Sequence, residues 1–373
     1  MGAALRSGII GTGFIGEVHA HAVRAAGGTV SAVAGRTTAS AERAAPALGA
    51  LHAAASPEAL IERDDIDVVH ICTPNATHAQ YTKLAIAAGK AVVCEKPLAT
   101  SVEDAAELAD LARRHRSVAA VPFVYRFYPA VREARDLARR GDAGRLWLLH
   151  GSYLQDWLAS PQATNWRVDP ARGGASRAFA DIGVHWCDLM EFVTGQRITR
   201  LVASTSQAFP ERSGEGGPSP VTTEDGASVL FETDQGAAGS VVVSQVTPGR
   251  KNRLWFSFDG TEASLSFDQE QPDTLWLGRT AAATRVAVGP DTLTTQAGRR
   301  YARLPAGHPH GYQDSFNAFV ADVYDAVRGG APDGLPTFAD GLRAAQLTQA
   351  LIDSAQGGGW VSVPAYDKVS TII

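Results

Sequence analysis

The first 125 residues alternate short apolar runs with amphipathic stretches, the pattern of strands and helices in turn. The predicted strands are Arg6–Ile10, Thr29–Ala34, Ile66–Cys72, Ala91–Cys94 and Val118–Val124. The predicted helices between them are Glu17–Ala26, Ala39–Leu48, Thr77–Ala88 and Val102–His115. Because parallel strands need a crossover helix, this alternation predicts βαβ units and a parallel sheet.

The pattern changes after a further predicted helix, Ala130–Arg139, because strand-like runs then follow one another with only turns between them. These runs are Leu146–Leu154, Leu201–Ala208, Ala227–Glu232, Ala237–Val246, Leu254–Asp259, Ala263–Phe267 and Thr274–Gly278. Consecutive strands favour an antiparallel or mixed sheet. Helices are predicted at Ile182–Val193, Tyr312–Val327 and Phe338–Ala355, and an exposed loop at Phe209–Pro220.

We therefore expect an α/β protein of two domains, residues 1–125 with a parallel sheet and residues 126–373 with a large open, mostly antiparallel sheet. The last helix, about residues 338–355, could pack back on the first domain. An open sheet face of this size needs a cover. The sequence therefore predicts a homodimer or homotetramer formed through that face.

Composition excludes several classes of function. The net charge of -5 argues against a nucleic-acid partner, and no run of apolar residues is long enough for a membrane span. The first strand begins at about residue 6, which leaves no room for a signal peptide, so we expect a cytoplasmic protein. The three cysteines, Cys72, Cys94 and Cys187, lack C-x-x-C spacing and are predicted to be small buried residues, not metal ligands.

A glycine-rich turn, Gly11-Thr12-Gly13-Phe14-Ile15-Gly16, follows the first predicted strand and opens a helix. In this context G-x-G-x-x-G is typical of a dinucleotide-binding Rossmann fold. Gly11 permits the tight turn, Gly13 lets the pyrophosphate approach the backbone, and Gly16 allows close packing. The start of the helix then offers the backbone N–H groups of Phe14 and Ile15 to the phosphates. A purely structural turn and a methyltransferase-type nucleoside site are the alternatives.

The second predicted strand ends in Ala34-Gly35-Arg36-Thr37, without the acidic residue that usually binds the adenine ribose of NAD. Arg36 could pair with a 2′-phosphate, with Thr37 and Thr38 donating hydrogen bonds. This favours NADP and leaves open NAD or the use of both. An ordinary exposed arginine is the alternative.

Two more strand ends should line the same cleft, because ligands of open α/β sheets lie beyond the carboxyl ends of the strands. One carries Thr73, Pro74 and Asn75, with His78 one helical turn further, and the other carries Glu95, Lys96 and Pro97.

Glu95-Lys96-Pro97 together with the glycine turn resembles the Gfo/Idh/MocA family of oxidoreductases, and the resemblance extends over essentially the whole chain. Tyr125-Arg126-Phe127-Tyr128-Pro129 and Asp181-Ile182-Gly183-Val184-His185 also carry it. A narrower resemblance to sugar dehydrogenases of the levoglucosan and inositol type is carried by Tyr153-Leu154-Gln155-Asp156-Trp157, Asn165-Trp166-Arg167 and Gly311-Tyr312-Gln313-Asp314.

The resemblance implies a catalytic group of Lys96, Asp181 and His185, and a Lys96-Pro97 segment at the nicotinamide, often with a cis peptide bond. The chemistry suits oxidation of an alcohol. An imidazole can take a proton near neutral pH, a carboxylate four residues earlier on the helix can orient it, and an ammonium can stabilise a developing alkoxide. The alternatives are a helix N-cap for Asp181 and a satisfied core histidine for His185.

Further polar and aromatic residues complete the predicted site. Tyr125, Tyr153, Gln155, Asp156 and His308, with Lys96, Asp181 and His185, are expected to contact the substrate. Arg126, Trp166 and Arg167 are expected at the cofactor, with solvated ion pairs and aromatic core as alternatives. No metal is expected, because His308 and His310 lack a carboxylate or cysteine partner nearby in sequence.

These features predict an NAD(P)-dependent oxidoreductase that acts on a secondary hydroxyl of a sugar or polyol. One alternative is a reductase of a keto-sugar or a diol-type substrate. Another is a dinucleotide-binding sensor without turnover, which would be expected to lack the Lys96, Asp181 and His185 set.

Overall fold

The computed structural model describes residues 3–214 and 217–365, and its contacts group the chain into two compact units. The first unit combines the residues up to Val124 with Tyr312–Ala345, and the second combines Tyr125–Gly311 with the stretch that begins at Gln346. The sequence predicted a boundary after residue 125 and placed all later residues in the second domain. The contacts differ in grouping Tyr312–Ala345 with the first unit.

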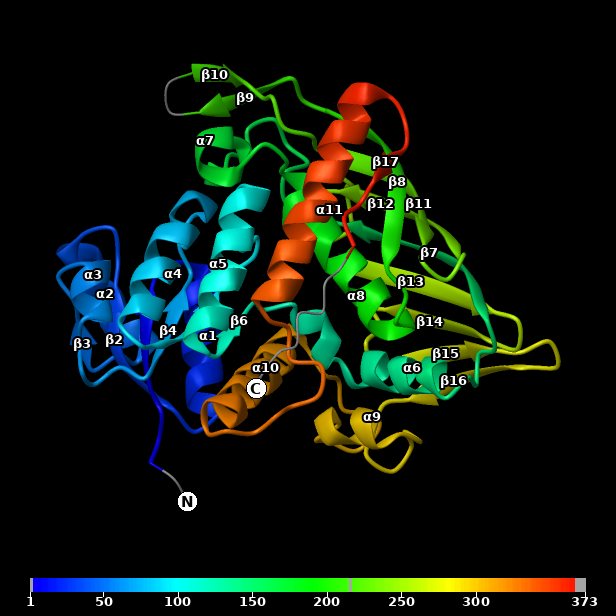
Figure 1. Ribbon diagram of the computed structural model, residues 1–373, viewed down its shortest axis with the longest axis horizontal. Helices are drawn as coiled ribbons and strands as arrows, with labels where there is room; N and C mark the ends of the chain where they lie inside the picture. Colours follow the sequence, from blue (N-terminus) through cyan, green and yellow to red (C-terminus); the bar gives the residue numbers. More distant parts are fainter. Residues whose placement is uncertain (1–2, 215–216, 366–373) are drawn as a thin grey trace. The chain divides into compact units, whose positions relative to one another are not determined.

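The first unit contains a six-stranded parallel sheet in the order β3-β2-β1-β4-β5-β6 (Figure 1). Its strands are β1 (Arg6–Ile10), β2 (Thr29–Ala34), β3 (His52–Ala53), β4 (Val68–Ile71), β5 (Ala91–Cys94) and β6 (Ala119–Ala120). Its helices are α1 (Phe14–Ala25), α2 (Thr38–Leu48), α3 (Pro57–Ile61), η1 (Asn75–Thr77), α4 (His78–Ala87), α5 (Val102–His115) and α10 (Tyr312–Val327). The predicted Rossmann fold is confirmed.

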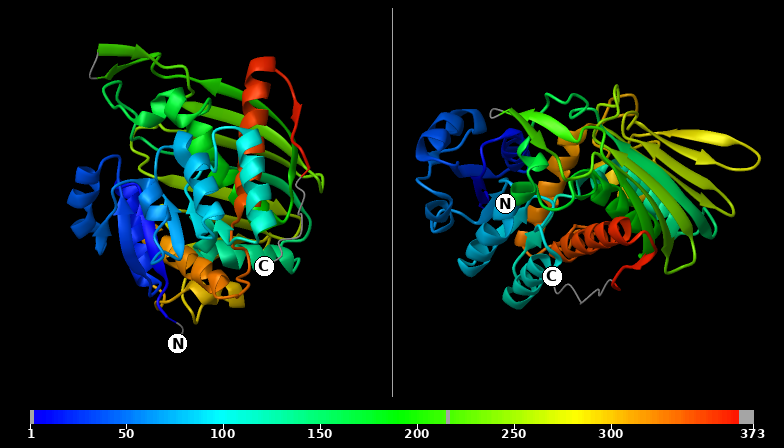
Figure 2. Two further views of the ribbon diagram at one scale, coloured as in Figure 1. Left: turned by 60° about the vertical axis from the view of Figure 1, so that its left-hand side comes forward. Right: turned by 90° about the horizontal axis from the view of Figure 1, so that it is seen from above.

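Contacts between helices show two covering layers for this sheet. Helix α1 contacts both α2 and α10, whereas α4 contacts both α3 and α5 (Figure 2). The central strands are buried on both faces, which is why they are near-continuous runs of valine and isoleucine. Side chains also fix the helix starts: Ser56 caps α3 ahead of Pro57, and Ser101 caps α5.

The predicted strand Val118–Val124 is wrong in length, because the observed strand is much shorter. Only Ala119–Ala120 pairs with β5, and the chain then enters the short 3-10 helix η2 (Val124–Phe127). Pro122 lacks the N–H group that a continuing ladder needs, and the N–H of Val121 donates to the carbonyl of Pro336.

The second unit contains a nine-stranded sheet in the order β16-β15-β14-β13-β7-β12-β11-β8-β17. Its strands are β7 (Leu146–Leu154), β8 (Ile198–Ser206), β11 (Gly226–Thr233), β12 (Ala238–Ser244), β13 (Arg253–Gly260), β14 (Ser264–Asp268), β15 (Thr274–Gly278), β16 (Ala283–Ala287) and β17 (Val361–Ser362). All neighbours are antiparallel except β12 and β7. The predicted large, mostly antiparallel sheet is confirmed.

Helices cover one face of this sheet and build its core. They are α6 (Pro129–Arg139), α7 (Pro170–Gly173), α8 (Val184–Thr194) and α9 (Gln296–Tyr301), with the 3-10 turn η3 (Trp166–Val168) and the π-helical turn η4 (Phe179–Gly183). Helix α11 (Phe338–Gly357) joins this unit with its second half. Under α8, the rings of Phe256 and Phe258 stack at 4.2 Å between centroids, and Trp186 packs on Phe258. Each buried aromatic ring stabilises the fold by about 1.5–3 kcal/mol.

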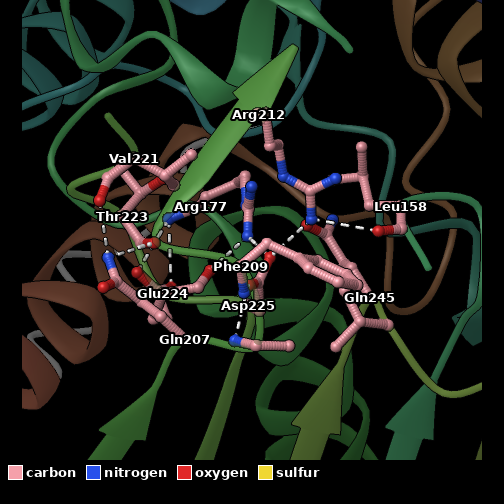
Figure 3. A network of polar contacts seen from close by, with 12 residues as sticks. Leu158, Arg177, Gln207, Phe209, Arg212, Val221, Thr223, Glu224, Asp225 and Gln245 are labelled. Carbon is pink, nitrogen blue, oxygen red and sulfur yellow. Dashed lines mark hydrogen bonds and ion pairs between the residues drawn. The ribbon is translucent and has the colours of Figure 1, made fainter. Parts of the chain in front are cut away.

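The segment Phe209–Pro220, predicted as an exposed loop, contains the strands β9 (Glu211–Gly214) and β10 (Gly217–Pro220), which pair antiparallel. Arg212 of β9 is buried and anchors the hairpin (Figure 3). Its guanidinium donates to the carbonyl oxygens of Leu158 and Ser160 and pairs with Asp225 at 2.9 Å. A buried arginine among polar and glycine residues gives no hydrophobic period, so sequence pattern did not predict the hairpin.

Asp225 is the centre of a buried charged network that also contains Arg177 and Glu224 (Figure 3). Its carboxylate pairs with Arg177 and Arg212 and accepts the N–H groups of Ala208 and Phe209 at 2.8 and 3.1 Å. Burial opposes ionisation of this carboxyl, but Arg177 and the other donors lower the pKa of Asp225 below its ordinary value. The carboxylate is therefore charged and ties several loops together.

Several short elements were not predicted: β3, α3, β16, α9 and β17. Most have five residues or fewer, too few to show a period. Among the described residues, none of the helices combines the length and the apolar character that crossing a bilayer requires.

Candidate functional site

The glycine turn of the first unit has the geometry that a bound phosphate needs. Gly11 has a φ of 116°, and a Cβ there would lie 2.4 Å from the carbonyl oxygen of Cys72. A Cβ at Gly16 would lie 2.3 Å from the carbonyl oxygen of Gly11. The fold itself therefore requires these two glycines.

Gly13 differs, because a Cβ at this position would meet no described atom within 4 Å. The protein's own packing gives no reason for a glycine here. A ligand that approaches the backbone does give one, so Gly13 argues against a purely structural turn. Gly13 is also the N-cap of α1 and has no side chain that could cap the helix. The neighbouring Phe14 is 73% exposed. The helix start can therefore receive a diphosphate.

At the end of β2, Arg36 is exposed, as expected of a residue that binds a 2′-phosphate. Thr37 is the N-cap of α2, and its Oγ1 accepts the N–H of Ser40 at 3.2 Å. The hydroxyl of Thr38 donates to the carbonyl of Ala55 at 3.2 Å. Of the predicted donors to a phosphate, Thr38 is thus engaged elsewhere, and Thr37 has a structural role as well.

His78 is fully buried and lies between two carbonyl oxygens of the predicted cleft. Its Nδ1 is 2.7 Å from the oxygen of Pro97, and its Nε2 is 2.9 Å from that of Thr73. Burial lowers the pKa of His78, although the two carbonyls oppose this. A neutral ring has one N–H and donates to one of these carbonyls at a time, while its buried position packs it between the two strand-end segments. The sequence predicts that His78 contacts the cofactor.

Local hydrogen bonds also order the segments that follow β4 and β5. Asn75 is buried, and Thr73 accepts a hydrogen bond from Thr77 at 2.7 Å. Glu95 is 6% exposed, and its Oε2 accepts the backbone N–H of Lys96 at 3.2 Å. The Lys96–Pro97 peptide bond is cis.

In the second unit, Asp181 lies inside η4 and His185 in the first turn of α8. The carboxylate of Asp181 accepts a hydrogen bond from Nε2 of Gln245 at 2.7 Å and lies 3.3 Å from Nε of Arg167. The N-cap residues of η4 and α8 are Ala178 and Gly183, so the N-cap alternative for Asp181 is wrong. His185 is 6% exposed. Lys96 belongs to the first unit, so that all three residues meet stays a prediction.

Two tyrosine hydroxyls meet beside His185. The hydroxyls of Tyr125 and Tyr153 are hydrogen-bonded, and the ring of Tyr125 lies edge-on to His185 at 5.2 Å between centroids. Asn252 accepts from Tyr153 at 2.8 Å and donates to Tyr125 at 3.3 Å. Burial raises the pKa of Tyr125 to about 12, so its hydroxyl is protonated at neutral pH.

The strand end after β7 extends this polar cluster. Nε2 of Gln155 donates to Asn252 at 2.7 Å, and Nε1 of Trp157 donates to Gln155 at 2.8 Å. Asp156 instead pairs with Lys251 at 2.7 Å. The hydrogen bond from Lys251 lowers the pKa of Asp156. Gln155 thus joins the tyrosine cluster, and Asp156 joins an ion pair.

Asn252 and Gln245 were not predicted. Gln245 directly follows β12 and Asn252 directly precedes β13, and a polar residue in such a turn carries no motif. The register between neighbouring strands gives the only signal, because Leu254 pairs with Tyr153 and the N–H of Gln155 donates to the carbonyl of Ser244. That register is not readable from one sequence.

Two of the residues expected at the cofactor are arginines with different surroundings. Arg167 stacks on Trp166 at 4.4 Å, close to Asp181. Arg126 forms a buried ion pair with Asp188, so the predicted alternative of a solvated pair is wrong for this residue.

His308 is exposed, and its Nδ1 donates to the carbonyl of Pro305 at 3.0 Å. In the described part of the chain, no group of three or more histidine, cysteine or acidic side chains could hold a metal ion. The three cysteines are buried, and burial raises the pKa of Cys94 to about 12.

Comparison with known proteins gives matches over both halves of the chain. Residues 5–123 match an oxidoreductase family with an NAD-binding Rossmann fold, and residues 131–266 match the GFO/IDH/MocA C-terminal domain. Levoglucosan dehydrogenase of Pseudarthrobacter phenanthrenivorans is 31% identical over 96% of this chain and 98% of its own length. The 1,5-anhydro-D-fructose reductase of Ensifer adhaerens is 31% identical over 92% of this chain and 97% of its own.

Solved structures agree with these matches. A structure of levoglucosan dehydrogenase in complex with NADH and levoglucosan has a TM-score of 0.91 and 30% identity, and the alignment covers 97% of this chain and 100% of that one.

Proposed function

Because the chain belongs to the Gfo/Idh/MocA oxidoreductase family, we propose that it transfers a hydride between a secondary hydroxyl of a sugar or polyol and a nicotinamide dinucleotide. The observation that carries this proposal is the cluster that the buried Tyr125 and Tyr153 form with Asn252 beside His185. Hydroxyl and amide groups that both donate and accept hydrogen bonds suit a substrate with several hydroxyls. The likeness to a levoglucosan dehydrogenase along nearly the whole chain supports the same class.

The catalytic roles follow from the chemistry of the side chains. His185 takes the proton of the substrate hydroxyl, and Asp181 orients it from the preceding turn, itself held by Gln245 and Arg167. Lys96 stabilises the developing alkoxide. The bound nicotinamide supplies the hydride acceptor. Tyr125, Tyr153, Gln155, Asp156 and His308 are proposed substrate contacts.

The first domain is proposed to hold the dinucleotide. The open space at Gly13 and the uncapped start of α1 support this. The proposed contacts are Gly11, Gly13, Phe14, Ile15, Gly16, Arg36, Thr37, Thr73, Pro74, Asn75, Glu95, Lys96, Arg126, Trp166 and Arg167, with His78 behind them. The fold family binds NAD, and the exposed Arg36 without an acidic neighbour supports use of NADP as well. Arg36→Ala should then weaken NADP binding selectively, and equal weakening of both cofactors would remove this role.

We further propose a cytoplasmic homodimer or homotetramer that associates through the open face of the nine-stranded sheet. Leu230, Val242 and Trp276 are exposed on its strands. In the strand register Leu230 lies opposite Ser240, two residues from Val242, which places the apolar side chains of Leu230 and Val242 on one face. Light scattering of the purified protein would give the number of subunits.

A second candidate is a reductase that works in the opposite direction, on a keto-sugar or a diol-type substrate. The similarity to a 1,5-anhydro-D-fructose reductase over 92% of the chain favours it. The same residues serve both directions, since the forward and reverse reactions pass through one transition state.

The experiment that tests the proposal follows nicotinamide absorbance with each cofactor against aldoses, inositols, anhydrosugars, glycosides and their keto forms. We expect turnover with at least one substrate that has a secondary hydroxyl or the matching ketone. Tight dinucleotide binding without turnover on the whole panel would instead indicate a sensor.

A further inference from the structure

Five buried polar side chains of the first unit form a continuous line of hydrogen bonds, which we call the Glu95 network. Its members are Tyr324 of α10, Ser7 of β1, His70 of β4, His19 of α1 and Glu95. The first four are fully buried and Glu95 is 6% exposed. Polar groups are costly in such a layer unless each one has partners, and a fully satisfied network rigidifies the core.

The distances along the network are those of hydrogen bonds. The hydroxyl of Tyr324 is 2.7 Å from Oγ of Ser7, which is 3.3 Å from Nε2 of His70. Nδ1 of His70 is 2.9 Å from Nδ1 of His19, and Nε2 of His19 is 3.1 Å from Oε1 of Glu95.

One direction of donation satisfies every link. Ser7 is the one hydrogen-bond partner of the Tyr324 hydroxyl in the described structure, so the buried phenol donates to Ser7. The Ser7 proton is then free to donate to Nε2 of His70, which leaves the His70 proton on Nδ1.

The same reasoning continues to the carboxylate. The Nδ1 proton of His70 is donated to Nδ1 of His19, which must therefore carry its own proton on Nε2 and donate it to Glu95. Both imidazoles are neutral in this arrangement. Burial lowers the pKa of His70 well below its ordinary value, in agreement with a neutral His70 ring.

The far end of the network determines what it can do. Tyr324 is fully buried, so protons have no exit to solvent there. At the near end, the second oxygen of Glu95 accepts the backbone N–H of Lys96 at 3.2 Å. The ring of His19 is also packed against Phe316 of α10 at 5.0 Å between centroids. The geometry suits positioning and does not suit proton delivery.

We propose that the Glu95 network is a positioning device: it holds the Glu95 carboxylate in one orientation, and this carboxylate fixes the main chain at Lys96. Its members other than Glu95 are positioning residues that act through Glu95. The proposal rests on the proposed function only where it assigns a consequence for turnover.

The first test needs no substrate. In protein labelled with nitrogen-15 at histidine, the ring signals should show His70 with its proton on Nδ1 and His19 with its proton on Nε2. The His70 ring should stay neutral between about pH 6 and about pH 8, where an ordinary histidine titrates. An imidazolium at either position, or the opposite tautomer of His70, would overturn the direction of the network.

The second test uses the backbone signal of Lys96 in protein labelled with nitrogen-15 at lysine, again without substrate. His70→Phe removes the middle link, so the Lys96 amide signal should shift. Tyr324→Phe is the matched control, because Ser7 can still donate to His70. An unchanged Lys96 signal in folded His70→Phe protein would show that the network does not position this residue.

The kinetic consequence is tested with the best substrate of the panel. His70→Phe should lower kcat about 10- to 100-fold, as misplacement of a reacting group does, and change KM for the dinucleotide by less than about threefold. Ser7→Thr keeps the hydroxyl and should retain kcat, whereas Ser7→Ala should lower it. If the panel gives no turnover, the labelled-protein tests still decide the positioning claim. A wild-type kcat in both His70→Phe and Ser7→Ala would refute it.

Discussion

The two units hold their polar residues by different means. In the unit with the parallel sheet, the candidate residues follow strands β1, β2, β4 and β5, and the Glu95 network is a line of neutral side chains that ends at one carboxylate. In the antiparallel unit, the candidate residues come from a π-helical turn, a strand and two turns, and the deepest polar network is fully charged around Asp225. The first arrangement depends on chain topology, and the second on ion pairs that tie loops together.

This difference predicts how each unit responds to substitution. Loss of a neutral hydrogen-bonding side chain should disturb the geometry of the residues that it positions, with little loss of stability. Loss of a buried charge should instead destabilise the fold. The predictions below compare the two units, beginning with the largest expected effect.

Asp225→Ala should destabilise the second unit by about 3–5 kcal/mol, because it leaves the buried guanidinium groups of Arg177 and Arg212 without a counter-charge. Denaturant unfolding followed by tryptophan fluorescence measures this loss. The exposed Asp291 provides the control, since Asp291→Ala should change stability by less than about 0.5 kcal/mol. Equal stability of the two variants would contradict the role given to the charged network.

Gly11→Ala should destabilise the first unit by more than about 1–2 kcal/mol, because the residue has a positive φ and a Cβ would meet the carbonyl of Cys72. Gly13→Ala should leave stability within about 0.5 kcal/mol of the parent protein. It should weaken dinucleotide binding at least tenfold, about 1.4 kcal/mol. Calorimetric titration with NADH and NADPH measures both variants. Normal binding by Gly13→Ala would mean that the open space beside it does not receive the dinucleotide.

Asn252→Ala should raise KM for the substrate about tenfold, because it removes a hydrogen-bond partner of Tyr125, Tyr153 and Gln155. The Kd for the dinucleotide should stay unchanged, since Asn252 belongs to the second unit. Steady-state kinetics together with NADH titration separates these effects. An unchanged KM would remove Asn252 from the substrate site.

The stability of the first unit should decrease as pH falls below about 6.5, the pKa of an unperturbed histidine. Burial lowers the pKa of His70 and His78, so the unfolded chain binds more protons than the folded one in that range. Each residue contributes up to about 1.4 kcal/mol per pH unit while only the unfolded state takes up the proton. His70→Phe should flatten this dependence. An equal slope in the variant would mean that His70 is not buried in the neutral form.

Much of the first unit was predictable from sequence, because parallel strands with helical crossovers bring their carboxyl ends to one edge whatever the side chains are. The glycine turn, Thr73 and Glu95 could therefore be assigned to one edge of the sheet. The burial of His78 could not be predicted, because a histidine on a helix gives the same sequence pattern whether its side chain is buried or exposed.

In the second unit, the sheet was predicted and the contacts within it were not. Tyr153 meets Asn252, 99 residues away, because β7 and β13 are neighbours in the sheet. Consecutive antiparallel strands can be arranged in many orders within a sheet, and no local sequence pattern selects one of these orders. Arg212 was missed for a related reason, since a buried arginine is stabilised by Asp225 and by carbonyl groups that only the folded chain brings together.

The central claim is that the first unit binds the dinucleotide and that the helix carrying His185 in the second supplies the base for proton transfer. The most direct measurement is the turnover number and the NADH Kd of His185→Asn, determined on one protein preparation. We predict a fall in turnover of about 10²- to 10⁴-fold with an unchanged Kd. Turnover equal to that of the parent protein, or loss of NADH binding, would contradict the account.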